Sequence, residues 1–262
     1  MKLKNAPVYL VIAQVRFNPI LNLEGFVTAI QEKMRLKGFP DFKRQVTQQL
    51  VMPFGNAEGV VPSMSAQLRF VFGDMVGQQN FSLDNNAISF QTTQYETFPE
   101  FLALFLEGVQ IVHEAIKLDY FERIGVRYLD VVFPRESESE TFMDYLIPEV
   151  VGLNQKVTGE VSHSYTETVS KDHQVQLIAR SYIQNGTLGL PDELVGRIPK
   201  VQQKFLDING WHAILDNDAS LEIRNPFNLE EIQKILTDLK EKIAASFKVT
   251  VTPKALEIWD NL

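Results

Sequence analysis

The chain has 262 residues, of which 45% are hydrophobic, and its 25 Lys and Arg against 33 Asp and Glu give a formal net charge of −8. A chain of this length can bury a large core without disulfides. The absence of cysteine excludes disulfides, thiolate metal sites, iron–sulfur clusters and cysteine nucleophiles. The acidic balance argues against a dominant nucleic-acid-binding surface, which is basic. No apolar run approaches the length of a membrane span, so we expect no membrane contact and a cytoplasmic protein that keeps its N-terminus.

The first half of the chain predicts a strand, a helix, several strands and a longer helix. Residues 8–17 are apolar on both faces and rich in β-branched side chains, which is typical of a buried strand. Asn22 can cap a helix that ends near Gly38. Turn residues then separate four strand-like segments, at 44–53, 65–72, 79–83 and 87–94. Thr97 and Glu100 form a capping box before a helix that runs to about residue 118.

The second half repeats this order of elements. The pattern predicts a strand at 121–133, an acidic mobile loop at 136–140, a short helix capped by Thr141, a hairpin at 159–184 that turns at 170–172, strands at 204–215 and 219–223, and an amphipathic helix at 228–248. Asn209-Gly210 is either a hairpin turn or a loop within one long strand.

These elements predict an α+β fold. We expect two similar strand–helix–antiparallel-sheet–helix units, an N-terminal one at 1–119 and a C-terminal one at 120–262, or one continuous domain of the same extent. The two units would share a curved sheet with the long helices packed on one face. This arrangement implies an internal duplication, although no residue-level repeat is visible.

Four stretches resemble a known bacterial family. They are Asn5-Ala6-Pro7-Val8, Arg123-Ile124-Gly125-Val126-Arg127-Tyr128-Leu129-Asp130, Leu206-Asp207-Ile208-Asn209 and Phe247-Lys248-Val249-Thr250-Val251-Thr252-Pro253. Together they are similar to the sporadically distributed bacterial proteins of about this length that have a family definition but no assigned function. Members often carry a glutamate just after the first motif, where this chain has Tyr9-Leu10. The resemblance implies a bacterial, cytoplasmic, single-chain protein and brings no reaction and no catalytic residues.

The common motifs of enzymes are missing from the sequence. There is no phosphate-binding Gly-rich loop, dinucleotide fingerprint, Gly-x-Ser-x-Gly or His-Glu-x-x-His motif. The four histidines, His113, His163, His173 and His212, are too far apart along the chain to form a local metal pair. We therefore predict no catalytic residue, no metal site and no cofactor.

The strand at 121–133 carries the best candidate for a binding site. The period of two places Arg123, Gly125 and Arg127 on one face, where a planar anion could approach the glycine between two guanidinium groups. The alternative is that both arginines pair internally with some of the 33 acidic residues. Arg180 and Arg69, in other predicted strands, fit either interpretation.

Trp211 is the fourth candidate ligand-binding residue, besides Arg123, Arg127 and Arg180. It is either a stacking platform for a ligand or an anchor in the core, and Trp259 is expected to dock the C-terminal tail on the body or on another subunit. The hydroxyl- and amide-rich faces of the hairpin at 159–184 predict either a polar groove or an ordinary solvated sheet face.

Three functions remain open from the sequence. The first is a non-catalytic protein that binds a protein partner or a ligand, in a bacterial accessory or defence system, with a protein partner or self-association into a homo-oligomer expected. The second is an enzyme with a dispersed acid–base site for a small anionic substrate, anchored by Arg123 and Arg127. The third, which the acidic charge disfavours, is a nucleic-acid binder that uses the concave face of the sheet.

Overall fold

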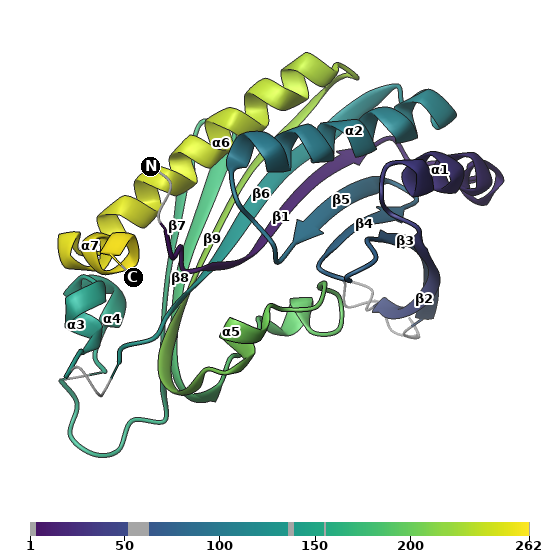
Figure 1. Cartoon of the computed structure of the whole chain (residues 1–262). Coiled ribbons are helices and arrows are strands. Elements are labelled where there is room, and N and C mark those ends of the chain that lie inside the picture. The colour runs from purple at the N-terminus through teal and green to yellow at the C-terminus, as the bar shows by residue number, and fades with distance from the viewer. Residues whose placement is uncertain (1–3, 52–62, 136–138, 155, 262) are drawn as a thin grey trace, which may run out of the picture.

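A computed structural model describes residues 4–51, 63–135, 139–154 and 156–261. It shows an α+β fold with a nine-stranded antiparallel open sheet and, among the described residues, seven α-helices (Figure 1). The elements are β1 (Val8–Phe17), α1 (Glu24–Leu36), β2 (Asp41–Val51), β3 (Ser63–Gly73), β4 (Gln79–Asp84), β5 (Ala87–Thr92), α2 (Phe98–Ile116), β6 (Tyr120–Val132), α3 (Phe142–Tyr145), α4 (Pro148–Val151), β7 (His163–Asp172), β8 (Val175–Thr187), a 3-10 turn (Asp192–Leu194), α5 (Gln203–Leu206), β9 (Asn209–Pro226), α6 (Leu229–Thr250) and α7 (Pro253–Asn261).

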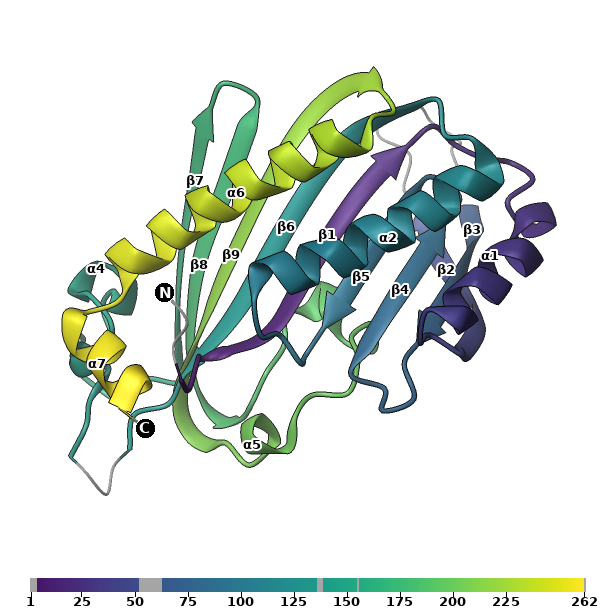
Figure 2. The same ribbon diagram turned by 45° about the horizontal axis from the view of Figure 1, so that its top comes forward.

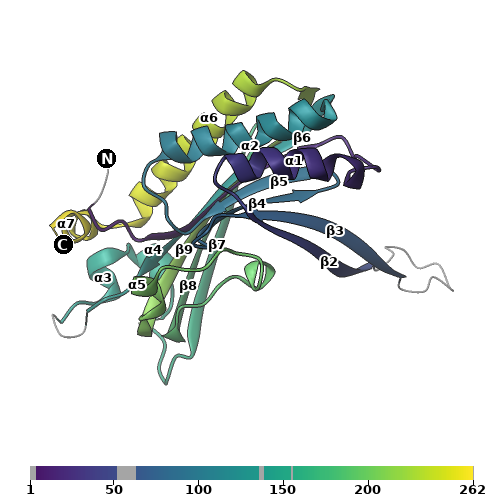
Figure 3. The ribbon, with the colours of Figure 1, turned by 45° about the vertical axis from the view of Figure 1, so that its right-hand side comes forward.

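The sheet is continuous through both halves of the chain. Its strand order is β2-β3-β4-β5-β1-β6-β9-β8-β7, which leaves β2 and β7 as the edges. The first strand of each half meets at the centre, where Ala13 of β1 is opposite Val126 of β6. Figure 3 shows how strongly the sheet twists and curves from β2 to β7.

Helices α1, α2 and α6 lie along one face of this sheet, which we call the helix face (Figures 1 and 2). Successive strand residues point to opposite faces, so β1 directs Val11, Ala13 and Val15 toward these helices. They share one buried cluster with Phe105 of α2 and Leu236 of α6. This cluster is the main core of the protein.

The opposite face, which we call the open face, is covered by residues 188–208 near one end of the central strands (Figure 2). Leu194, Phe205 and Ile208 from this segment pack on Leu129 of β6 and Ile214 of β9. Residues 196–202 of this segment extend to the side of the sheet that holds β4 and β5, where residues 196–200 form one wall of a pocket.

A third cluster buries the C-terminal tail within the same chain. Trp259 of α7 is 6% exposed and lies against Phe247 and Tyr145, with ring centroids 5.9 and 5.8 Å away. The tail therefore docks on the body of its own chain. No helix in the described part of the chain is long and apolar enough to cross a membrane.

Several local details differ from the sequence expectations. Residues 203–206 form the helical turn α5 instead of a strand, because this turn buries Phe205 against Tyr9, with ring centroids 5.9 Å apart. Asn209-Gly210, for which the sequence leaves both a hairpin turn and a loop within one long strand open, begins β9, where Gly210 pairs with Gly186 of β8. Because β9 runs without a break from Asn209 to Pro226, the strands expected at 204–215 and 219–223 are not separate. The turn of the β7–β8 hairpin lies at residues 173–174, later than expected, with His173 at φ 55°. Of the expected mobile loop at 136–140, residues 136–138 lie outside the described part.

Candidate functional site

Three of the four predicted ligand-binding residues share the open face of the sheet. Arg123 and Arg127 project from β6, and Arg180 projects from β8. Strand β9 runs between them and places Asp218 opposite Arg127 and Asp216 opposite Arg180. The period of two predicts the shared face of Arg123 and Arg127, whereas the place of Arg180 beside them and the two carboxylates in between depend on the strand pairing.

Arg127 and Arg180 are engaged internally. The Nε and Nη2 atoms of Arg127 donate to the carboxylate of Asp216 at 2.7 and 2.6 Å, and Nη2 also donates to Glu193 at 2.8 Å. Arg180 donates to Glu167 at 2.7 Å and to Asp216 at 3.3 Å. Because Asp216 is fully buried, it depends on these charged partners. Burial alone would lower the pKa of Arg127, but the hydrogen bonds and charge of Asp216 raise it above its ordinary value.

Arg123 fills the predicted notch itself. A Cβ atom added to Gly125 would lie 3.1 Å from Nη1 of Arg123, so the guanidinium covers the glycine. Nη1 also donates to Gln14 of β1 at 3.2 Å. Burial raises the pKa of the nearby Asp218, and the charges of Arg123 and Arg127 oppose that rise. The guanidinium of Arg123 therefore occupies the space over Gly125 in which the sequence predicted an anion.

Trp211 does not join the arginines. It packs against the cluster that holds Trp259, Phe247 and α3, on the same side of β9 as Ala213 and Leu215. Ile214 and Asp216 alternate with these residues and point to the open face. The position of Trp211 is therefore that of an anchor in the core.

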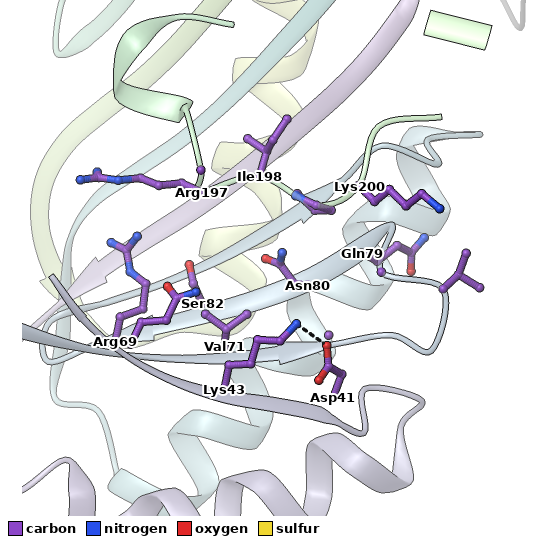
Figure 4. A pocket seen from close by; sticks show the side chains of 16 residues that line it. Asp41, Lys43, Arg69, Val71, Gln79, Asn80, Ser82, Arg197, Ile198 and Lys200 are labelled. Atoms are coloured by element: carbon purple, nitrogen blue, oxygen red, sulfur yellow. Dashed lines mark hydrogen bonds and ion pairs between the residues drawn. The ribbon is translucent and has the colours of Figure 1, made fainter. Parts of the chain in front are cut away.

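A pocket opens elsewhere on the open face, between strands β2, β3 and β4 and the segment 196–200 (Figure 4). Its volume is about 310 Å³. Lys43, Arg69, Arg197 and Lys200 line it, together with the single acidic residue Asp41. The lining is therefore basic although the whole chain has a net charge of −8, and we call this cavity the cationic pocket.

Strand register and three tethers build this pocket. Lys43 of β2 is opposite Val71, and Val71 is opposite Ser82 of β4, so these side chains share the open face. The wall made by 196–200 is held by the amide of Lys200, which donates to the Gly77 carbonyl at 2.7 Å. The Thr93 hydroxyl donates to the Lys200 carbonyl at 2.6 Å, and the Gln202 side-chain amide donates to the Thr93 carbonyl.

The four basic groups differ in how firmly they are held. Arg69 donates from Nε and Nη2 to Asp84 at 2.9 and 2.8 Å, which uses two of the five N–H donors of its guanidinium. Lys43 pairs with Asp41 at 2.6 Å (Figure 4). Arg197 and Lys200 extend from the other wall with exposed side chains. The pocket thus combines one fixed arginine with two exposed cations across the gap.

Sequence reasoning singled out only Arg69 among these residues. The segment Arg197-Ile198-Pro199-Lys200 has two basic residues around a proline, a loop signal without a functional pattern of its own. Its place opposite Arg69 depends on the tethers to Gly77 and Thr93, which lie more than a hundred residues earlier in the chain.

In the described ranges, no three His, Asp or Glu side chains are grouped as metal ligands. Comparison of the chain with protein-family models, with curated proteins and with solved structures gives no match.

Proposed function

We propose that this protein binds a small anionic ligand in the cationic pocket and does not convert it chemically. The observation that carries the proposal is that Arg69 from one wall and Arg197 and Lys200 from the other line the same cavity of about 310 Å³. A cavity of this size is at the small end of ligand pockets, which suits a compact phosphate- or carboxylate-bearing molecule.

The electrostatics of the pocket support an anion. Asp84 fixes the guanidinium of Arg69 and leaves its remaining donors for a ligand, and a guanidinium matches the planar or forked oxygens of carboxylate and phosphate. Arg197 and Lys200 can close on the same anion from the opposite wall. Since Asp41 and Asp84 offset two of the four positive charges, the pocket keeps a net positive charge of about two.

The two alternatives have weaker support. An enzyme anchored by Arg123 and Arg127 needs free guanidinium donors, and Arg127 already uses its donors on Asp216 and Glu193. A nucleic acid on the open face would meet the carboxylates of Asp218 and Glu167 beside the arginines, which repel phosphate.

Inorganic pyrophosphate is a suitable probe of the pocket, titrated calorimetrically at low ionic strength. The double variant R197E/K200E should weaken binding at least about tenfold, because it places two negative charges against the probe. The variant K171E/K234E makes the same change in net charge at exposed positions outside the pocket and should bind like wild type. Equal loss in both variants, or no binding of pyrophosphate to wild type at millimolar concentration, would refute the proposal.

Association with a protein partner or a second copy of the chain is a separate proposal. Native mass spectrometry of protein isolated from its host tests it: a second polypeptide or a multiple of 29.9 kDa supports association. A bare monomer contradicts it, and a bound mass of a few hundred daltons supports the ligand.

Membership of the bacterial family, a cytoplasmic location and a role in an accessory or defence system likewise stay predictions.

We also infer that the two halves descend from one duplicated unit. Each half begins with a central strand, β1 or β6, and has a long helix, α2 or α6, after its last strand. From the β1–β6 pair, the remaining strands of each half extend outward in opposite directions. This symmetry of order supports the inference.

A further inference from the structure

A second cavity, of about 390 Å³, lies on the helix face, between α6 and the strands β1 and β6. Most of its wall is apolar and includes Pro7, Val8, Ile243, Phe247 and Leu256. It is separated from the cationic pocket by the sheet itself. We call it the helix-face cavity.

Asp130 places a carboxyl group in the wall of this cavity. It follows Tyr128 by two residues on β6, so both side chains point toward α6. Asp130 is only 6% exposed, and nothing in the described part of the chain forms a hydrogen bond or an ion pair with its side chain. Asp216, the other deeply buried aspartate of this region, receives two arginines. Asp130 is thus a hydrogen-bond acceptor with no donor among the described residues. Burying a carboxylate without a partner costs free energy, because the charge loses its hydration and gains no compensating interaction.

The other polar groups around Asp130 do not supply that donor. The hydroxyls of Tyr95 and Tyr128 bond to each other at 3.1 Å, and Tyr9 of β1 lies nearby. Lys240 and Lys248 of α6 line the cavity, but neither pairs with Asp130, and Lys240 lies over the Phe98 ring at 5.9 Å. Burial raises the pKa of Asp130 to about 7, as expected where no facing cation offsets the loss of water.

We propose that the helix-face cavity binds a small, mainly apolar amine whose ammonium group donates to the carboxylate of Asp130. The apolar wall takes the body of such a molecule, and the amine supplies both the missing charge and the missing donors. The rings of Tyr95 and Tyr128, 5.4 Å apart and nearly perpendicular, add aromatic faces that attract a cation. The inference is independent of the cationic pocket, because the two sites lie on opposite faces and select ligands of opposite charge.

Three probes of similar size and different charge test the inference: phenethylamine, phenethyl alcohol and hydrocinnamate. Each is titrated into ¹⁵N-labelled full-length protein while amide resonances are followed. Phenethylamine should give saturable shifts around the cavity, and the alcohol and the acid should bind at least about tenfold more weakly.

Variants locate the binding site. D130N should lose at least about tenfold in affinity for phenethylamine, because it removes the acceptor charge. The matched control D218N changes another largely buried aspartate, on the open face, and should leave the affinity unchanged. K248Q removes a positive charge from the cavity wall and should keep or increase the affinity for the amine.

The wild-type protein gives a second test that does not depend on the folding of any variant. The amine remains protonated below pH 8, so its affinity should fall as the pH is lowered through 7 and Asp130 takes up a proton. Equal binding of amine and acid, an unchanged affinity in D130N, a flat pH dependence, or no saturable shift at about 20 mM phenethylamine would each overturn the inference.

Discussion

Replacing Asp130 by asparagine isolates the free energy of one buried carboxylate. The two side chains have nearly the same shape, and only aspartate can ionise. Burial raises the pKa of Asp130 in the folded protein to about 7 from an ordinary value of 3.8. The folded state therefore holds this proton more tightly than the unfolded state, and the stability that it contributes is present at low pH and lost as the pH rises through 7.

The size of the effect follows from the two pKa values. At 1.36 kcal/mol per pKa unit, the difference between 3.8 and about 7 corresponds to about 4 kcal/mol of unfolding free energy lost by wild type between acidic pH and pH 8. About 3 kcal/mol of this loss falls between pH 5 and pH 8. D130N cannot ionise and should not show this loss. Its stability relative to wild type should therefore rise by about 3 kcal/mol over the same range.

Urea unfolding, followed by the fluorescence of Trp211 and Trp259 at several pH values, measures this difference. S246A is the control: it removes a hydroxyl that donates to Asn217 at 2.7 Å, and it changes no ionisable group. Its stability relative to wild type should be the same at every pH. A difference between D130N and wild type that does not change with pH would show that Asp130 is not a buried, unpaired acid.

Three further substitutions test the packing and charge network by urea unfolding. R127M removes the bidentate partner of the fully buried Asp216 and should cost about 3 kcal/mol; an unchanged stability would show that Arg180 alone suffices. G108A would place a Cβ atom 2.2 Å from the buried Phe81 ring and should cost about 2 kcal/mol despite the better helix propensity of alanine; a more stable variant would contradict this close approach. N228A removes the side-chain cap of α6 and should cost about 1 kcal/mol, and no loss would show that water replaces the cap.

Much of the fold follows from local patterns in the sequence. Strand β1 covers Val8–Phe17, as its β-branched and aromatic residues predict, and Thr97 caps α2 by accepting a hydrogen bond from the amide of Glu100. The apolar period of α6 is confirmed by the buried Ile232, Leu236 and Ile243. These elements are predictable because each places its own apolar residues at one regular spacing.

The segment around α5 shows where local patterns fail. Phe205 and Leu206 fit a strand as well as a helical turn when only their neighbours are considered. The choice is made by Tyr9 and the rest of the cluster on the open face, which accepts Phe205 from a helical turn. Tyr9 and Phe205 lie far apart in the sequence, so the pattern of the few residues around Phe205 cannot reveal this contact.

The candidate sites fail to appear in the sequence for the same reason. The alternation of β6 correctly places Arg123 and Arg127 on one face, but the carboxylate that binds Arg127 is 89 residues away. The sequence shows that acidic residues outnumber basic ones, but it does not show which carboxylate pairs with which arginine. Whether an arginine is free for a ligand or held by the fold therefore depends on tertiary structure.

Strand β6 presents different chemistry to the two faces of the sheet. Its residues alternate between an open face, where Arg127 meets Asp216, and a helix face, where Tyr128 and Asp130 meet the cavity under α6. A slip of one residue against β1 or β9 would exchange these sets and bury the arginines among the apolar residues of the main core. The register that keeps charges out of the core is therefore also the register that leaves one carboxylate, Asp130, on the core side. Among the described residues this carboxylate has no partner, which is the observation that the proposed amine ligand would account for.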